Sequence, residues 1–206
     1  MNKEALRLYA VTDRGCLKNG ISLETAVEQA LRGGATMVQL REKDMGHEEM
    51  YKEAMALKEV CKRYNVPFII NDDVYLAKEV GADGVHVGQD DMDPSEVRKI
   101  LGPDKIVGVT AKTLEQAQKA YKAGADYLGS GAVFTSVTKS NAKKLSIEDL
   151  DRIAQSVPIP VVAIGGINSS NVSNLKGTHI AGIAVVSGIF GKEDIEKGAR
   201  ELLTGL

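Results

Sequence analysis

Short apolar runs rich in β-branched residues alternate along the chain with amphipathic stretches of helical periodicity. A helix between two successive strands places them parallel in one sheet, with the helices covering its faces. Eight repeats of this alternation predict an α/β fold, a single (β/α)8 TIM barrel that spans residues 1–206. The predicted strands cover residues 6–12, 36–41, 68–71, 84–87, 105–110, 127–130, 160–164 and 182–187.

Signals for helix boundaries support this alternation. The second, fourth and sixth predicted strands each follow a Gly-Ala pair, which begins at Gly34, Gly81 or Gly124, and glycine there suits a left-handed helix C-cap. A doubly wound open sheet is the alternative fold, but residues 11–15 lack the Gly-rich turn that such a sheet carries after its first strand. Residues suited to helix N-caps precede five of the amphipathic stretches: Ser22, Asp93, Thr113, Ser146 and Asn168.

Charge and composition exclude two classes of partner. The net charge is −2 and cationic residues are spread among acidic ones, so the chain lacks the basic field that attracts nucleic acid. No apolar run reaches the ~20 residues of a membrane helix. Cys16 and Cys61 are not spaced as a metal or redox pair, which is typical of a reduced cytoplasmic protein. No feature of the sequence predicts an oligomeric state.

The second predicted strand ends in an unusual polar sequence. Gln39, Arg41 and Lys43 are two residues apart, so in an extended strand they share one face, opposite Val38 and Leu40. An amide and two cations at a strand end form a suitable receptor for phosphate or diphosphate oxygens. A solvated edge strand is the alternative interpretation.

Carboxylates follow the next two strands. Asp72 and Asp91 lie after neighbouring predicted strands, and magnesium prefers a few carboxylates together with substrate phosphate and water. We therefore expect an Mg²⁺ site there, with helix capping as the alternative role and as the expected role of Asp73 and Asp93. His86, in the fourth strand, is expected to be a hydrogen-bonded core residue.

Small residues follow the last two strands. Gly165 and Gly166 end the seventh strand, and Ser187 and Gly188 end the eighth. These are positions at which TIM barrels often bind phosphate through backbone N–H groups. A tight strand-to-helix turn is the alternative explanation of the glycine pair.

Together these strand ends closely resemble the thiamine phosphate synthase family, over nearly the whole chain. The resemblance implies a magnesium-dependent transferase that joins a hydroxymethylpyrimidine diphosphate to a thiazole phosphate and releases diphosphate. Both substrates are small phosphorylated molecules. The matching segments are residues 9–13, 39–43, 70–73, 84–92, 124–127, 163–167 and 185–187.

The resemblance also implies roles for individual residues. Arg41, Lys43 and Lys139 would be catalytic, and Asp72 and Asp91 would bind the magnesium. The other implied substrate contacts are Gln39, Leu40, Glu42, Asn71 and Thr110 toward the pyrimidine diphosphate, and Ser136, Val137, Thr138, Gly166, Val186 and Ser187 toward the thiazole phosphate.

Some positions depart from the family pattern. Thr110 stands where the family has serine, and residues 135–137 replace a Pro-Thr-Pro type segment, which predicts a less pre-organised loop and an altered turnover rate. Two rival functions share the fold: a thiazole phosphate isomerase of the same family, and a non-catalytic module that binds thiamine intermediates. The retained Arg41, Lys43 and Lys139 argue against the isomerase, which performs no diphosphate chemistry.

Overall fold

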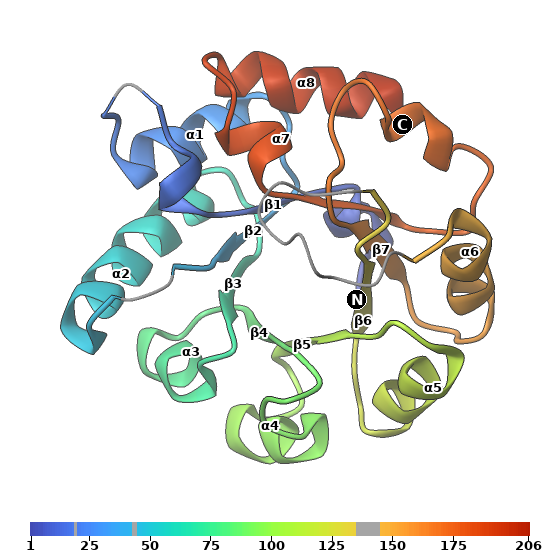
Figure 1. Cartoon of the computed structure of the whole chain (residues 1–206). Coiled ribbons are helices and arrows are strands. Elements are labelled where there is room, and N and C mark those ends of the chain that lie inside the picture. The colour runs from blue at the N-terminus through green and yellow to red at the C-terminus, as the bar shows by residue number, and fades with distance from the viewer. Residues whose placement is uncertain (19, 43–44, 135–144) are drawn as a thin grey trace.

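The computed structural model describes residues 1–18, 20–42, 45–134 and 145–206. In these residues eight parallel strands close into a barrel in chain order, with helices arranged around it (Figure 1). Each strand pairs with its sequence neighbours, and β8 pairs with β1, which confirms the predicted (β/α)8 barrel. The strands are β1 Leu8–Val11, β2 Met37–Leu40, β3 Phe68–Asn71, β4 Gly84–Val87, β5 Ile106–Thr110, β6 Tyr127–Gly131, β7 Val161–Ile164 and β8 Gly182–Val185.

The helices begin largely where the sequence predicts. The side chains of Ser22, Asp93, Thr113 and Ser146 each accept a hydrogen bond from a backbone N–H of the first helical turn. Asp73 caps a helix in the same way, as expected. The helices are α1 Leu23–Arg32, α2 His47–Arg63, α3 Val74–Val80, α4 Pro94–Leu101, α5 Leu114–Lys122, α6 Ile147–Gln155, α7 Ser187–Phe190 and α8 Ile195–Gly205, with 3-10 turns η1 Lys3–Leu6, η2 Arg14–Cys16 and η3 Val172–Leu175.

The connection between β7 and β8 differs from the prediction. Asn168 was expected to cap a helix, but only the short 3-10 turn η3 follows it. The Asn168 side chain instead accepts from the Ser170 backbone N–H at 2.9 Å, and Asn171 Oδ1 accepts from the Asn168 backbone N–H at 2.9 Å. These local side-chain bonds compete with helix formation and hold the segment in turns.

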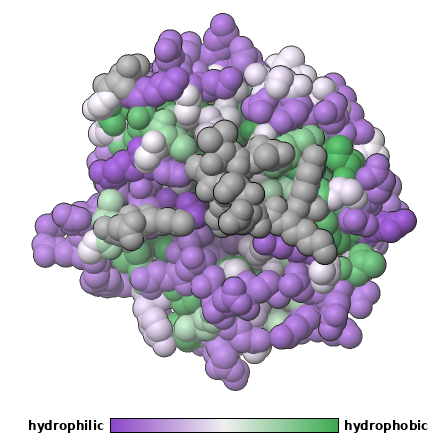
Figure 2. All heavy atoms as spheres, viewed as in Figure 1, coloured by the Kyte–Doolittle hydropathy of each residue, from purple (hydrophilic) through white to green (hydrophobic). Residues whose placement is uncertain are grey.

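The strands are buried on both faces. Alternate side chains, among them Tyr9, Met37, Ile69 and Tyr127, fill the barrel interior, while their neighbours pack outward beneath the helices. Figure 2 shows hydrophilic residues over much of the molecular surface in the same view. Within the described ranges no helix combines the length and the apolar content needed to cross a bilayer. The parallel order brings the carboxyl ends of all the strands to one mouth of the barrel, where the site is to be sought.

Candidate active site

The end of β2 holds the first group of predicted site residues. The Gln39 side chain enters the barrel and is 4% exposed, whereas Leu40 packs outward into the core beneath the helices. The strand was predicted to reach Arg41, but it ends at Leu40 because the Arg41 N–H donates to the side chain of Thr12, at 2.9 Å, and not to a strand carbonyl. Arg41 is half-buried just beyond the strand. Lys43 lies outside the described residues.

Glu42 is held by the first loop of the barrel. Its carboxylate accepts from the Thr12 hydroxyl at 2.8 Å and from the Arg14 backbone N–H at 3.1 Å. Burial raises the pKa of this carboxyl, and the two hydrogen bonds act in the opposite direction. These contacts tie the β2 end to the β1 end. The structure thus gives Glu42 a bracing position behind Arg41.

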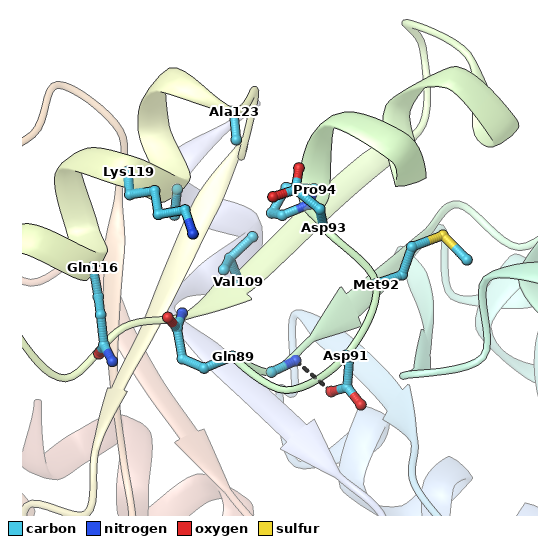
Figure 3. Close-up of a pocket in the computed structure, with 11 residues that line it drawn as sticks. Gln89, Asp91, Met92, Asp93, Pro94, Val109, Gln116, Lys119 and Ala123 are labelled. Atoms are coloured by element: carbon cyan, nitrogen blue, oxygen red, sulfur yellow. Dashed lines mark hydrogen bonds between the residues drawn. The ribbon is translucent and has the colours of Figure 1, made fainter.

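Two carboxyls face each other after β3 and β4. Asp72 and Asp91 lie within hydrogen-bonding reach of each other, and burial followed by the proximity of Asp91 raises the pKa of Asp72 to about 6. The Arg41 charge and a 2.6 Å hydrogen bond from Asn71 lower the same pKa. Asp91 also accepts from the Gly88 backbone N–H at 2.7 Å, as Figure 3 shows.

This pair fits a divalent cation. Like charges this close resist being ionised together, and a dication between them removes the repulsion. Asp72 has a left-handed backbone, with φ of 61°, which is uncommon outside glycine. In this conformation the Asp72 carboxyl, at the end of β3, interacts with the Asp91 carboxyl, which follows β4. Among the described residues no cluster of three or more His, Cys, Asp or Glu side chains is suited to a metal. Two carboxylates with open positions suit magnesium that also binds substrate oxygens.

A chain of polar side chains crosses the barrel interior beneath this pair. Gln39 Nε2 lies 2.5 Å from the Tyr9 hydroxyl, which lies 2.8 Å from the Tyr127 hydroxyl. His86 is 3.0 Å from Tyr127 through Nδ1 and 3.0 Å from the Thr110 hydroxyl through Nε2. His86 is therefore a hydrogen-bonded core residue, as predicted, and desolvation lowers its pKa to about 4.

Tyr9 and Tyr127, the two tyrosines in this row of hydrogen bonds, were not predicted as site residues from the sequence. Burial raises the pKa of both phenols, so they remain protonated. The available signal was their position: each lies within a strand at a position that faces the barrel interior, where a buried hydroxyl requires a partner. Tyr9 and Tyr127 are 1% and 0% exposed, and their rings meet edge to face with centroids 5.9 Å apart.

The ends of β7 and β8 form a separate part of the mouth. Gly166 has φ of 65°, and its carbonyl accepts from Asn171 Nδ2 at 2.9 Å. Ser187 is exposed at the start of α7, directly after the half-buried Val186. A Cβ atom on Gly188 would lie 2.3 Å from the Ile167 carbonyl oxygen, so the loops after β7 and β8 are in close contact. This contact places the loops that carry Gly166, Val186 and Ser187 side by side, and a shared anion site there stays a prediction.

Other predicted residues lie outside the described part of the chain: Ser136, Val137, Thr138 and Lys139. A further pocket opens beside the mouth, between α4 and α5 (Figure 3). Asp91, Gln89 and Lys119 are among its lining residues, and Gln89 Nε2 donates to the Thr110 carbonyl oxygen at 2.5 Å. This bond fixes the β4 loop against the end of β5.

A (β/α)8 barrel with facing carboxyls, a neighbouring guanidinium and a glycine-rich mouth after β7 and β8 defines an enzyme for phosphorylated substrates. Residues 8–189 match the family model described as thiamine monophosphate synthase. The chain belongs to this family, and the predicted enzyme class, a transferase, is confirmed.

Similar proteins cover nearly the whole chain. Thiamine-phosphate synthase of Clostridium tetani is 52% identical over 195 residues, which are 95% of this chain and 93% of the relative. The protein of that name from Ruminiclostridium cellulolyticum is 53% identical over 196 residues, with the same coverage. The solved structure of thiamine phosphate pyrophosphorylase from Pyrococcus furiosus has a TM-score of 0.90 at 40% identity, and the match covers 98% of this chain and 96% of that one.

Proposed function

We propose that this enzyme joins 4-amino-5-hydroxymethyl-2-methylpyrimidine diphosphate to hydroxyethylthiazole phosphate and so forms thiamine phosphate and diphosphate. The observation that carries the proposal is the meeting of Asp72, Asp91 and the charge of Arg41 at one point of the barrel mouth. Such a set suits a magnesium ion bound together with the oxygens of a diphosphate. The names of the full-length relatives support the same reaction.

In the proposed reaction, the bond between the pyrimidine methylene carbon and the diphosphate oxygen breaks, and both electrons leave with diphosphate. Arg41, with Lys43 and Lys139, binds the leaving oxygens and stabilises the charge that develops on them. Asp72 and Asp91 would hold magnesium, which when bound would supply further positive charge to the same oxygens. Asn71 holds the Asp72 carboxyl in place through its 2.6 Å hydrogen bond.

The electron-rich aminopyrimidine ring spreads the positive charge left on carbon, and the thiazole nitrogen then forms the new carbon–nitrogen bond. No protein nucleophile is needed for these two steps. We propose that Gly166, Val186 and Ser187 bind the thiazole phosphate, with Ser136, Val137 and Thr138 from the loop after β6. The protein mainly holds the two rings in contact in a site shielded from water.

One coupled assay tests this proposal. The purified protein is given both phosphorylated substrates, with magnesium or with excess chelator, and thiamine phosphate and diphosphate are both measured. We expect both products in equal amounts, and only with magnesium. Turnover of thiazole phosphate alone into an isomer would identify the isomerase branch, and ligand binding without any product would identify a binding module. We further propose a cytoplasmic setting, in keeping with two cysteines that form no disulfide.

A further inference from the structure

We propose that Tyr9, Tyr127 and His86 are positioning residues that form a one-directional chain of hydrogen bonds and thereby make the Thr110 hydroxyl a donor to the substrate diphosphate. The proposal rests on the proposed function, in which Thr110 and Gln39 contact the pyrimidine diphosphate. None of the three residues needs to touch the substrate. They act through the direction in which the two tyrosine hydroxyl protons and the ring proton of His86 point.

The chain of hydrogen bonds joins residues of five strands through the closed interior of the barrel. It runs from Gln39 on β2 to Tyr9 on β1, then to Tyr127 on β6, His86 on β4 and finally Thr110 at the end of β5. The four links measure 2.5, 2.8, 3.0 and 3.0 Å. Both tyrosines are almost fully buried, so no bulk water competes for their hydroxyls.

Counting protons fixes the direction of the chain. Gln39 Nε2 has only protons to give, so the Tyr9 oxygen accepts and its single proton passes to the Tyr127 oxygen. Tyr127 must then donate to Nδ1 of His86, which leaves the ring proton on Nε2. The Nε2–H group donates in turn to the Thr110 oxygen.

The direction has a consequence at each end. Thr110 already accepts from His86, so its own proton is directed elsewhere, and the residue is half-buried at the mouth where an anion would bind. At the other end, Gln39 commits its N–H to Tyr9 and keeps its carbonyl oxygen as an acceptor, which suits a ligand amino group. If the hydrogen bonds ran in the opposite direction, Thr110 would donate its proton to His86 and would present only lone pairs to the diphosphate.

The ring proton of His86 reports the direction without any ligand. We would record long-range ¹H–¹⁵N correlations of the histidine rings in ligand-free protein at neutral pH, and assign His86 from the signals lost in His86→Gln. The expected result is the Nε2–H tautomer in the wild type. An Nδ1–H tautomer there would overturn the proposal.

A reversal experiment sharpens this test. In Gln39→Glu, studied at a pH high enough to ionise the new buried carboxyl, the carboxylate can only accept, so Tyr9 must donate to it and every later bond must turn around. His86 is then expected as the Nδ1–H tautomer. An unchanged tautomer in a folded Gln39→Glu protein would refute the one-directional chain. Because the spectra need no turnover, they separate failure of this inference from failure of the proposed reaction.

Kinetics connect the chain to the substrate. Tyr127→Phe keeps the ring but removes the hydroxyl that bonds both Tyr9 and His86. We expect kcat/KM for the pyrimidine diphosphate to fall about five- to tenfold, the effect of one neutral hydrogen bond from Thr110 to the substrate. The KM for the thiazole phosphate should stay within about twofold, well inside the scale of one hydrogen bond. Tyr121→Phe, on the exposed face of α5, is the matched control. Equal kinetics in both variants would contradict the link to Thr110, as would a Thr110→Ser enzyme no better than Thr110→Val.

Discussion

The carboxyls of Asp72 and Asp91, which follow the neighbouring strands β3 and β4, lie within hydrogen-bonding reach of each other. Burial and this proximity together raise the pKa of Asp72 to about 6. Two acidic groups so placed destabilise each other when both are ionised. The arrangement is therefore costly to the protein without a cation and favourable with one.

We expect Mg²⁺ to raise the thermal unfolding midpoint of the wild-type protein at pH 8, well above the pKa of about 6 of Asp72. Asp72→Asn should lose this response, because one of the two facing charges is removed, and most of the synthase activity with it. Asparagine tolerates the left-handed backbone at this position, so the variant should fold and should be at least as stable as the wild type without metal. Thermal melts with and without MgCl₂ measure both effects.

Asp73→Asn is the matched control for this prediction. Asp73 lies next to Asp72 but caps α3, accepting from the Leu76 N–H at 2.8 Å, and asparagine caps helices equally well. Its magnesium response should match that of the wild type. A full response in Asp72→Asn would show that the facing pair does not bind the ion.

The second prediction separates the two anion sites. Ser187→Ala should weaken binding of the thiazole phosphate by about 1 kcal/mol, the cost of one hydrogen bond, with little effect on the pyrimidine diphosphate. Gly166→Val should be more severe, since valine is strained at φ of 65° and its side chain would block approach to the backbone. Titration calorimetry with each ligand measures the difference, and Ser173→Ala, in the exposed part of η3, is the control. Equal weakening of both ligands would refute the division.

The architecture could be predicted because several local signals agree. The apolar alternation, four N-cap residues and the left-handed glycines at 34, 81 and 124 all match the structure. The expected helix after Asn168 was wrong because asparagine side chains bond the local backbone there. The extension of β2 to Arg41 was wrong because the Arg41 N–H donates to the side chain of Thr12, which follows β1 and is distant in sequence.

The sequence predicts which residue types lie at the candidate site, but not the contacts that these residues make with one another. A carboxylate at a strand end indicates a metal ligand by its residue type, and on that ground the sequence predicts Asp72 and Asp91 as ligands. A tyrosine within a strand indicates a buried hydroxyl that needs a partner, but it does not identify that partner. The links among Tyr9, His86 and Tyr127 join β1, β4 and β6, and they exist only after the barrel has closed.

The third prediction concerns Lys139, which lies outside the described residues and whose role remains a prediction. If its ammonium contacts the leaving diphosphate, its benefit is larger in the transition state than in the ground state. Lys139→Ala should then lower kcat more than it raises KM for the pyrimidine substrate, with a loss of ~2 to 4 kcal/mol, or about a hundred- to a thousandfold in rate. Steady-state kinetics measure this split. A drop below about threefold, on that same scale, would exclude such a contact.

The last prediction concerns stability in acid. The pKa of His86 is lowered from 6.5 to about 4, chiefly by desolvation, so between these pH values the unfolded chain binds a proton that the folded protein does not. His86 alone should therefore lower the free energy of unfolding as the pH drops from 6.5 to 4, by at most ~3 kcal/mol, because one pKa unit corresponds to ~1.4 kcal/mol. The raised pKa of Asp72 acts in the opposite direction in this pH range, so the contribution of His86 is read from the difference between the wild type and a His86 variant.

Urea titrations across this pH range measure the slope. His86→Gln cannot take up the proton, so its stability should fall less steeply with acid than that of the wild type, even if the variant is less stable at pH 7. His47→Gln, which removes an exposed histidine 3.3 Å from Glu79 at the start of α2, is the control for the loss of a histidine outside the barrel. Parallel slopes for the wild type and His86→Gln would mean that His86 becomes protonated within the folded barrel, with its hydrogen bonds to Tyr127 and Thr110 rearranged.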